Sequence, residues 1–336
     1  MLYPLANYFA RWGAIAMNNA SMIKTRLCRL CMLAFFCLLT ACAATGVREA
    51  TQNTQLPRKA ELTRTPFFPQ AQYQCGPAAL ATALVAADIP VTPDQLTPEV
   101  YVPSRQGSLQ IEMLAAARRH GAVAIQIPPQ LDAVMQEVAA GNVVVVMQNL
   151  GFSWVPSWHY AVLIGYDLDK QLVWLRSGTY ERFEMSLSAF ERTWARSEHW
   201  AFVALPPGKL PASADADTVA RALVTYEKNA SAADRKTAYQ AAVNQWPDHQ
   251  VLLMGLGNAA YAMHDLPLAA ATFSHMTEMH PDSAAAYNNL ANVLLAQNQI
   301  AQAEMAAQKG LSVAGGNEKL KSQIAQTLME IRQARH

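Results

Sequence analysis

A 34-residue spacing in the C-terminal third is the feature that most restricts the fold of this 336-residue chain. Trp246-Pro247-Asp248 is followed 34 positions later by His280-Pro281-Asp282. A fixed period of this length is typical of stacked helix pairs, because one pair cannot bury its apolar face without a neighbour. Strand signals disappear beyond a Pro- and Gly-rich linker at 206–216, so we expect an all-α solenoid over 217–336.

The residues inside this period resemble those of the tetratricopeptide repeat. Small, aromatic and aliphatic residues recur at the helix contacts of such repeats, namely Leu256-Gly257, Ala269 and Phe273, then Tyr287, Leu290-Ala291, Ala303 and Leu311. A degenerate unit at about 217–246 precedes them, and a polar helix at about 317–334 follows as a cap. A generic helical bundle is the alternative. The resemblance implies a concave surface over 217–336 that binds a protein partner.

The N-terminal segment is predicted to be a signal peptide. Basic residues within 24–29 precede an apolar run of about ten residues at 30–39, too short to span a bilayer as a stable helix. The run ends in Leu39-Thr40-Ala41-Cys42, which resembles the bacterial lipoprotein signal, where cleavage leaves a lipidated cysteine. An ordinary secretory signal is the alternative. We therefore expect a signal peptide over 1–41 and a membrane anchor through lipid on Cys42.

The residues after Cys42 predict where the mature protein resides. Ala43 at the next position resembles the default for sorting to the outer membrane, so we expect a place in the bacterial cell envelope, facing the periplasm. The polar residues that follow predict a lipidated tether over 42–65. The chain has five cysteines, which are Cys28, Cys31, Cys37, Cys42 and Cys75. Cleavage and lipidation would leave Cys75 as the one free thiol, without a disulfide partner or a second cysteine to share a metal.

Composition excludes several classes of partner. The net charge is +1 and 15% of residues are charged, with no basic block or stripe, so we expect no nucleic-acid partner. The chain also shows no glycine-rich nucleotide loop. We therefore expect neither a cofactor nor a metal site.

Residues 66–205 mix helix and strand patterns, which predicts an α+β domain. The expected helices are 77–87, 109–120 with Ser108 as N-cap, 131–140 and 188–194, and the expected strands are 122–127, 143–147, 159–166, 172–175 and 199–205. Helices lead and an antiparallel sheet follows, joined in part by a turn at 167–170.

Cys75 and His159 are the candidates for nucleophilic chemistry. Cys75 precedes Gly76-Pro77, and proline favours the first helical position, so the thiol is expected at a helix N-terminus. The helix dipole and free N–H groups there favour a thiolate and can donate to an oxyanion. His159 begins an apolar strand, where it could supply a base. The alternatives are a packed small side chain for Cys75 and a half-exposed strand-end histidine for His159.

Two motifs then resemble a known family. QCGPAAL at 74–80 and HYAVLIGYD at 159–167 look like the bacteriocin-processing (double-glycine leader) peptidases, whose fold is papain-like. FFPQ at 67–70 and GSLQ at 107–110 resemble the stand-alone branch, which lacks transporter domains. The resemblance implies a papain-like domain over 66–205, with Cys75 as nucleophile and His159 as general base, resting as a thiolate–imidazolium pair.

The resemblance also implies an oxyanion donor and an orienting acid. The family's glutamine lies six residues before the cysteine, where this chain has Pro69. We therefore expect Gln70 to be the oxyanion donor, with Gln72 and Gln74 as alternatives. Ser177 stands where the family has an aspartate. Its hydroxyl can accept from imidazole but carries no charge to stabilise imidazolium. Asp167 and Asp169 lie too early in the sequence to take the place of the family's aspartate. Glu181 could take it only if the alignment with the family is shifted.

Two functions follow from these expectations. The first is a lipid-anchored extracytoplasmic cysteine peptidase that hydrolyses peptide bonds in a peptide or protein substrate, with the repeats recruiting substrate or partner. The alternative is a catalytically weak or inactive peptidase-like scaffold whose repeats bind partner proteins. A related acyl or amide transfer by the same Cys/His pair is a third, smaller possibility.

Overall fold

The computed structural model describes residues 46–70 and 74–335. The predicted signal peptide, Cys42 and the alternative oxyanion donor Gln72 lie outside the described residues. Within the described ranges, no helix is long and apolar enough to cross a membrane.

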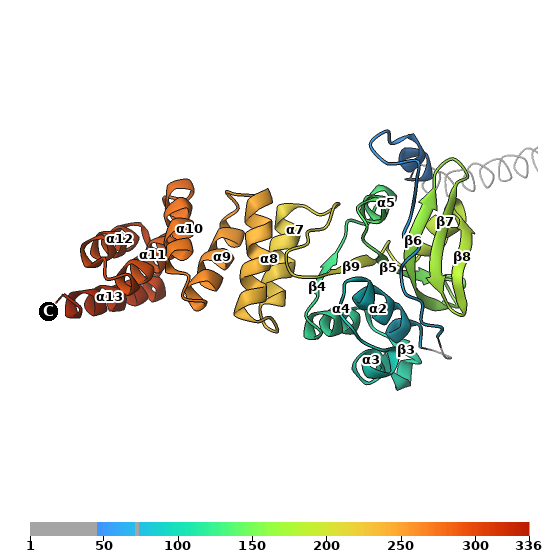
Figure 1. Cartoon of the computed structure of the whole chain (residues 1–336), viewed down its shortest axis with the longest axis horizontal. Helices are drawn as coiled ribbons and strands as arrows, with labels where there is room; N and C mark the ends of the chain where they lie inside the picture. The colour runs from blue at the N-terminus through green and yellow to red at the C-terminus, as the bar shows by residue number, and fades with distance from the viewer. Residues whose placement is uncertain (1–45, 71–73, 336) are drawn as a thin grey trace, which may run out of the picture.

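The N-terminal part of the described chain is built on a seven-stranded antiparallel sheet, seen at the right of Figure 1. Its strands are β1 (Lys59–Glu61), β4 (Val123–Gln126), β5 (Val144–Asn149), β6 (Trp158–Asp167), β7 (Leu172–Ser177), β8 (Tyr180–Ser186) and β9 (Ala201–Leu205). The strand order is β4-β9-β5-β6-β7-β8, and β1 also pairs with β6. A separate two-stranded ribbon joins β2 (Tyr101–Val102) to β3 (Gly107–Ser108).

Helices cover both faces of this sheet. They are α2 (Cys75–Ala86), α3 (Pro93–Val100), α4 (Gln110–Arg119), α5 (Leu131–Ala139) and α6 (Leu187–Ala195), with a short 3-10 turn at Pro103–Arg105. The apolar run of β5 explains the two layers, because alternate side chains point to opposite faces. Val145 packs into the core with α2 and α4, whereas Val144 and Val146 pack into the core with α5 and α6. This arrangement confirms the predicted α+β class.

The segment expected to be a tether is instead folded onto the sheet. Residues 46–52 are helical, β1 pairs with the end of β6, and Ala50 and Leu56 are buried in the core that holds α5. Arg58 is further held by Asp169, with 2.8 Å between Nη2 and Oδ1. The polar composition concealed this docking, because only a few apolar residues of the segment, among them Val47, Ala50 and Leu56, pack against the core.

Three local expectations also need correction. Ser108 does not cap α4: the N-cap is Leu109, and Ser108 pairs with Tyr101 in the small ribbon. Strand β8 was missed because it is an edge strand with mostly exposed polar side chains. Helix α3 was missed although Thr92 and Gln95 form a capping box at its start, a signal visible in the sequence.

The C-terminal part is a stack of helix pairs. It comprises α7 (Ala216–Tyr226), α8 (Ala232–Gln245), α9 (Gln250–Ala262), α10 (Leu266–Met279), α11 (Ala284–Ala296), α12 (Ile300–Val313) and α13 (Glu318–Gln333). Figure 1 shows them following one another away from the sheet, with the C-terminus at the far end. A Cβ on Gly257 would lie 2.5 Å from the Phe273 ring, so the small position predicted from the period permits close helix contact.

The two parts share one apolar core. Side chains from α7, including Val219 and Leu223, pack in the same cluster as residues of the sheet. The buried Glu137 carboxylate on α5 accepts from both the backbone N–H (2.8 Å) and the hydroxyl (2.6 Å) of Ser213 in the linker. The Tyr226 hydroxyl on α7 donates to the carbonyl of Gly121, 3.1 Å away. The first repeat helix is therefore attached firmly to the sheet domain.

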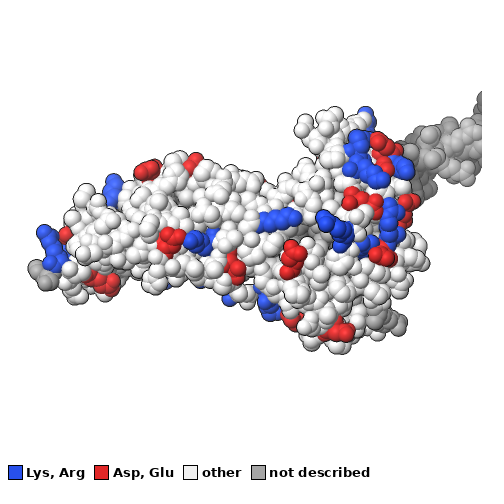
Figure 2. Space-filling model, in the orientation of Figure 1, with Lys and Arg blue, Asp and Glu red and all other residues white. Residues whose placement is uncertain are grey.

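The visible surface carries few charged side chains. Figure 2 shows Lys and Arg interspersed with Asp and Glu, most densely over the sheet domain. The face of the repeats in this view is largely uncharged.

Candidate active site

The thiol of Cys75 lies at the first residue of α2. Gly76 allows the close approach of the small ribbon, because a Cβ there would fall 2.1 Å from the Ser108 hydroxyl. The backbone N–H groups of Tyr160, Gly76 and Cys75 itself are placed to donate to the sulfur. Cys75 is free and buried. The Gly-Pro step therefore puts the thiol at a helix N-terminus, against the start of β6.

His159 lies near the start of β6 and contacts the end of β7. Its Nε2 is 2.8 Å from the Ser177 hydroxyl. Ser177 is the last residue of β7, and Gly178 follows it with a φ of +63°, a left-handed conformation that glycine adopts without strain. The second ring nitrogen of His159 is thereby left available for other chemistry.

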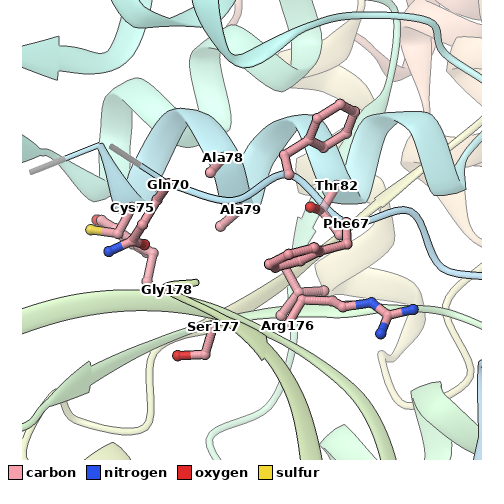
Figure 3. A pocket seen from close by; sticks show the side chains of 12 residues that line it. Phe67, Gln70, Cys75, Ala78, Ala79, Thr82, Arg176, Ser177 and Gly178 are labelled. Carbon is pink, nitrogen blue, oxygen red and sulfur yellow. The ribbon is translucent and has the colours of Figure 1, made fainter. Parts of the chain in front are cut away.

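Gln70 is held beside the thiol by the neighbouring strand end. Its backbone N–H donates to the carbonyl of Gly178 at 3.2 Å. Figure 3 shows its side chain next to Cys75, and both residues line the same two pockets. The segment before Gln70 is held by Arg176, whose buried guanidinium donates to the carbonyl of Thr65 at 2.5 Å and to that of Thr63 at 3.3 Å. Arg176 thus anchors the segment that leads to Gln70.

A cleft of about 650 Å³ brings the candidates together. It is lined by Gln70, Cys75, Arg105, Gln106, Gly107, Ser108, Leu109, Gln110, Met147, Pro156, Ser157, Trp158, His159 and Tyr160. Ser177 lies outside this cleft and lines a small adjoining pocket with Gln70 and Cys75. The thiol, the imidazole and the Gln70 amide therefore share one solvent-filled space, with Ser177 behind the imidazole.

Burial sets the charge state of the pair. It raises the pKa of the Cys75 thiol, a shift only partly opposed by the backbone donors of Tyr160 and Gly76. It also lowers the pKa of His159 to about 4. Both directions favour the neutral thiol and imidazole near pH 7, contrary to the resting ion pair that we expected. The physical reason is that both groups are desolvated while the nearest partner of the imidazole, Ser177, is uncharged.

The carboxylates considered as alternatives are occupied elsewhere. Asp167 accepts from the backbone N–H of Lys170 at 2.9 Å, which forms the predicted turn, and Asp169 pairs with Arg58. Glu181 approaches the Arg176 guanidinium at 4.0 Å. Of the acidic residues in the described ranges, none is hydrogen-bonded to His159.

Two further features of the site were not apparent in the sequence. Arg176 is a buried cation that follows the apolar run of β7, and only the fold shows which carbonyls it holds. The Tyr160 hydroxyl donates to the carbonyl of Ser108 at 3.2 Å, and burial together with the nearby Cys75 raises its pKa. Among the described residues, no group of three or more His, Cys, Asp or Glu side chains is placed to hold a metal ion.

Comparisons with known proteins found one family model and several solved structures similar to this chain. Residues 62–201 match the model of the Peptidase_C39 like family. A C39-like peptidase structure from Bacillus anthracis aligns at 19% identity over 45% of this chain and 99% of that chain, with a TM-score of 0.39. No curated protein matches the sequence.

Structures of helical repeats align with about a third of the chain. The first tetratricopeptide repeat domain of Spaghetti, bound to an HSP90 peptide, aligns at 16% identity over 35% of this chain and 91% of that chain, with a TM-score of 0.32. The type III secretion translocator chaperone SycD of Yersinia enterocolitica aligns at 18% identity over 37% and 89%, with a TM-score of 0.34.

Proposed function

We propose that this protein is a cysteine peptidase in which Cys75 is the nucleophile, His159 the general base and Gln70 an oxyanion donor. The observation that carries the proposal is the convergence of these three groups in one cleft, at a helix N-terminus, from positions up to 89 residues apart in sequence. The match of residues 62–201 to the Peptidase_C39 like family supports the same reaction class.

The geometry suits acyl transfer through a thioester. His159 takes the thiol proton as Sγ attacks the substrate carbonyl carbon, and the oxyanion accepts from the Gln70 amide and the N–H groups at the start of α2. The peptide C–N bond then breaks, and the amine departs with the proton from His159. Water, deprotonated by His159, hydrolyses the thioester and restores the thiol.

Ser177 takes the orienting role in this proposal. At 2.8 Å from Nε2 its oxygen accepts an N–H from that nitrogen, which leaves Nδ1 unprotonated and able to act as the base. A hydroxyl orients the ring but offers no charge to the imidazolium that forms during reaction. We therefore expect a slower enzyme than one with a carboxylate at this position.

Replacement of the nucleophile tests the proposal. Cys75→Ala should abolish peptide hydrolysis and labelling by a thiol-directed peptide inhibitor, whereas Gln74→Ala, on the neighbouring residue, should keep both. Equal labelling of the wild-type and Cys75→Ala proteins would remove Cys75 from the mechanism.

A scaffold without turnover is the second candidate, and it is favoured by the hydrogen bond of His159 to the uncharged Ser177 hydroxyl in place of a carboxylate. An active pair gives two titrations in the pH dependence of kcat/KM, one for the thiol and one for the imidazole. Absence of turnover across a peptide library, in a correctly folded protein, would support the scaffold instead.

The remaining parts of the proposal concern location and partners. We propose that lipid on Cys42 anchors the protein in the bacterial envelope, at the outer membrane and facing the periplasm, and that helices α7–α13 recruit the substrate or its complex. Labelling with radioactive palmitate in wild-type and Cys42→Ser cells tests the anchor. Crosslinking from the repeats, followed by mass spectrometry, identifies the partner.

A further inference from the structure

A group of exposed aromatic side chains lies beside the candidate active site. The connection between β5 and β6, together with the first residue of β6, spans residues 150–158 and is here called the aromatic loop. Trp154 is 79% exposed, Phe152 62% and Trp158 50%, and Leu150 and Val155 of the same loop are also exposed. Isolated exposed apolar residues are common on protein surfaces, whereas several of them gathered in one place are typical of a binding site.

The aromatic loop is held in a defined shape. The buried Asn149 accepts through Oδ1 from the backbone N–H groups of Gly151 (3.0 Å) and Ser157 (2.9 Å). Arg196 donates to the carbonyls of Asn149 (3.1 Å) and Gly151 (2.8 Å) from the opposite side. The rings of Phe152 and Trp154 stack at 5.0 Å with an interplanar angle of 7°. Because these contacts already fix the loop, binding of a ligand to the rings costs little additional conformational entropy.

The loop continues directly into the catalytic cleft. Pro156, Ser157 and Trp158 line the cleft beside His159. Leu109, 39% exposed, lines it too and precedes α4, so apolar side chains from two separate elements border the same space. Arg105 is the one Lys, Arg, Asp or Glu residue in this lining. The cleft therefore suits a bulky apolar side chain and disfavours a basic one.

We propose that the aromatic loop binds the substrate segment that follows the scissile bond, and that it selects a large apolar or aromatic side chain there. The direction follows from the chemistry: the departing amine takes its proton from His159, so the leaving segment lies on the His159 side of the cleft. Trp158 adjoins His159 in the chain, and both residues line the cleft. The inference rests on the proposed function, because it assigns a substrate class to the same site.

Short peptides too small to reach the repeats provide the test. Two peptides differ only at the residue after the cleavable bond, Phe in one and Ala in the other. Wild-type kcat/KM should favour Phe by about 10- to 100-fold, the range expected when an apolar pocket is filled. Trp158→Ala should reduce this ratio to near unity and Trp158→Phe should largely retain it. Tyr261→Ala, an exposed aromatic on α9, should leave the ratio as in the wild type.

A measurement of peptide binding distinguishes failure of the proposed selectivity from failure of the proposed peptidase activity. The Cys75→Ala protein is titrated with fluorescein-labelled forms of the two peptides, and their dissociation constants are compared by fluorescence anisotropy. Selective binding of the Phe peptide without hydrolysis by the wild type supports the selectivity and rejects the peptidase. Hydrolysis with a Phe/Ala ratio that Trp158→Ala leaves unaltered overturns the selectivity and keeps the peptidase.

A lipid bilayer is the competing occupant of the aromatic loop. The unlipidated Cys42→Ser chain is mixed with vesicles of phosphatidylethanolamine and phosphatidylglycerol and sedimented. If Trp154→Ala abolishes vesicle binding and the Trp158 variants keep the wild-type peptide preference, the proposal is overturned. Equal sedimentation of the variants, together with altered peptide preference, supports it.

Discussion

Replacing Ser177 with aspartate should increase the fraction of the Cys75/His159 pair that is present as thiolate and imidazolium. The Ser177 hydroxyl is 2.8 Å from His159 Nε2, so a carboxylate at this residue reaches the same nitrogen. An opposite charge at this range shifts a pKa by about 1–3 units, or about 1.4–4 kcal/mol. From its present value of about 4, the pKa of His159 would then rise to roughly 5–7.

The effect on the thiol can be measured directly. The population of thiolate–imidazolium pair should grow roughly 10- to 1000-fold in Ser177→Asp, and the rate of Cys75 alkylation by iodoacetamide near pH 6 should grow with it. NMR titration of the His159 ring reports the pKa itself. Ser177→Asn is the matched control, because it has a similar size and no charge. Identical His159 pKa values in the two variants would refute the electrostatic reasoning.

Three further outcomes are expected. Gln70→Ala should lower kcat about 10²- to 10³-fold through loss of an oxyanion donor, while Gln74→Ala has little effect on peptide hydrolysis; equal losses would reassign the donor. Because the folded pKa of His159 lies near 4, below the ordinary 6.5, the unfolded chain binds more protons between these values. Acidification from pH 6.5 to 4.5 should therefore destabilise the wild type by about 2 kcal/mol more than His159→Gln, measured by urea unfolding at these two pH values. Gly257→Ala should destabilise the repeats by about 1–3 kcal/mol, because its methyl group meets the Phe273 ring; an unchanged denaturation midpoint would contradict this packing.

The repeat stack was predictable because its determinants are periodic and local. The 34-residue spacing places the same residue types at each helix contact, so one unit predicts the next. The degenerate unit and the terminal cap also appear in the structure, as α7–α8 and α13. By contrast, the predicted tether carries no comparable period, and its docking depends on a strand that lies about a hundred residues further along.

The site was predictable in its parts but not in its charge state. The adjacent Gly-Pro step predicted a helix start close to Cys75, and α2 begins at Cys75 itself, two residues before the expected start at Pro77. Arg176 could not be connected to Gln70, because that link passes through carbonyls of Thr63 and Thr65 that only the fold brings near. The neutral form of the Cys75/His159 pair follows from burial, a quantity that no pattern of residues measures.

The sequence by itself determined which side chains can do chemistry and which segments form helices, since residue type, capping and periodicity are properties of neighbouring residues. The tertiary structure alone decided that 46–61 covers the sheet, that Arg176 holds the carbonyl of Thr65 before Gln70, and that burial disfavours the charged forms of Cys75 and His159. These features depend on contacts between distant residues and on the exclusion of water, which arise only when the elements pack together.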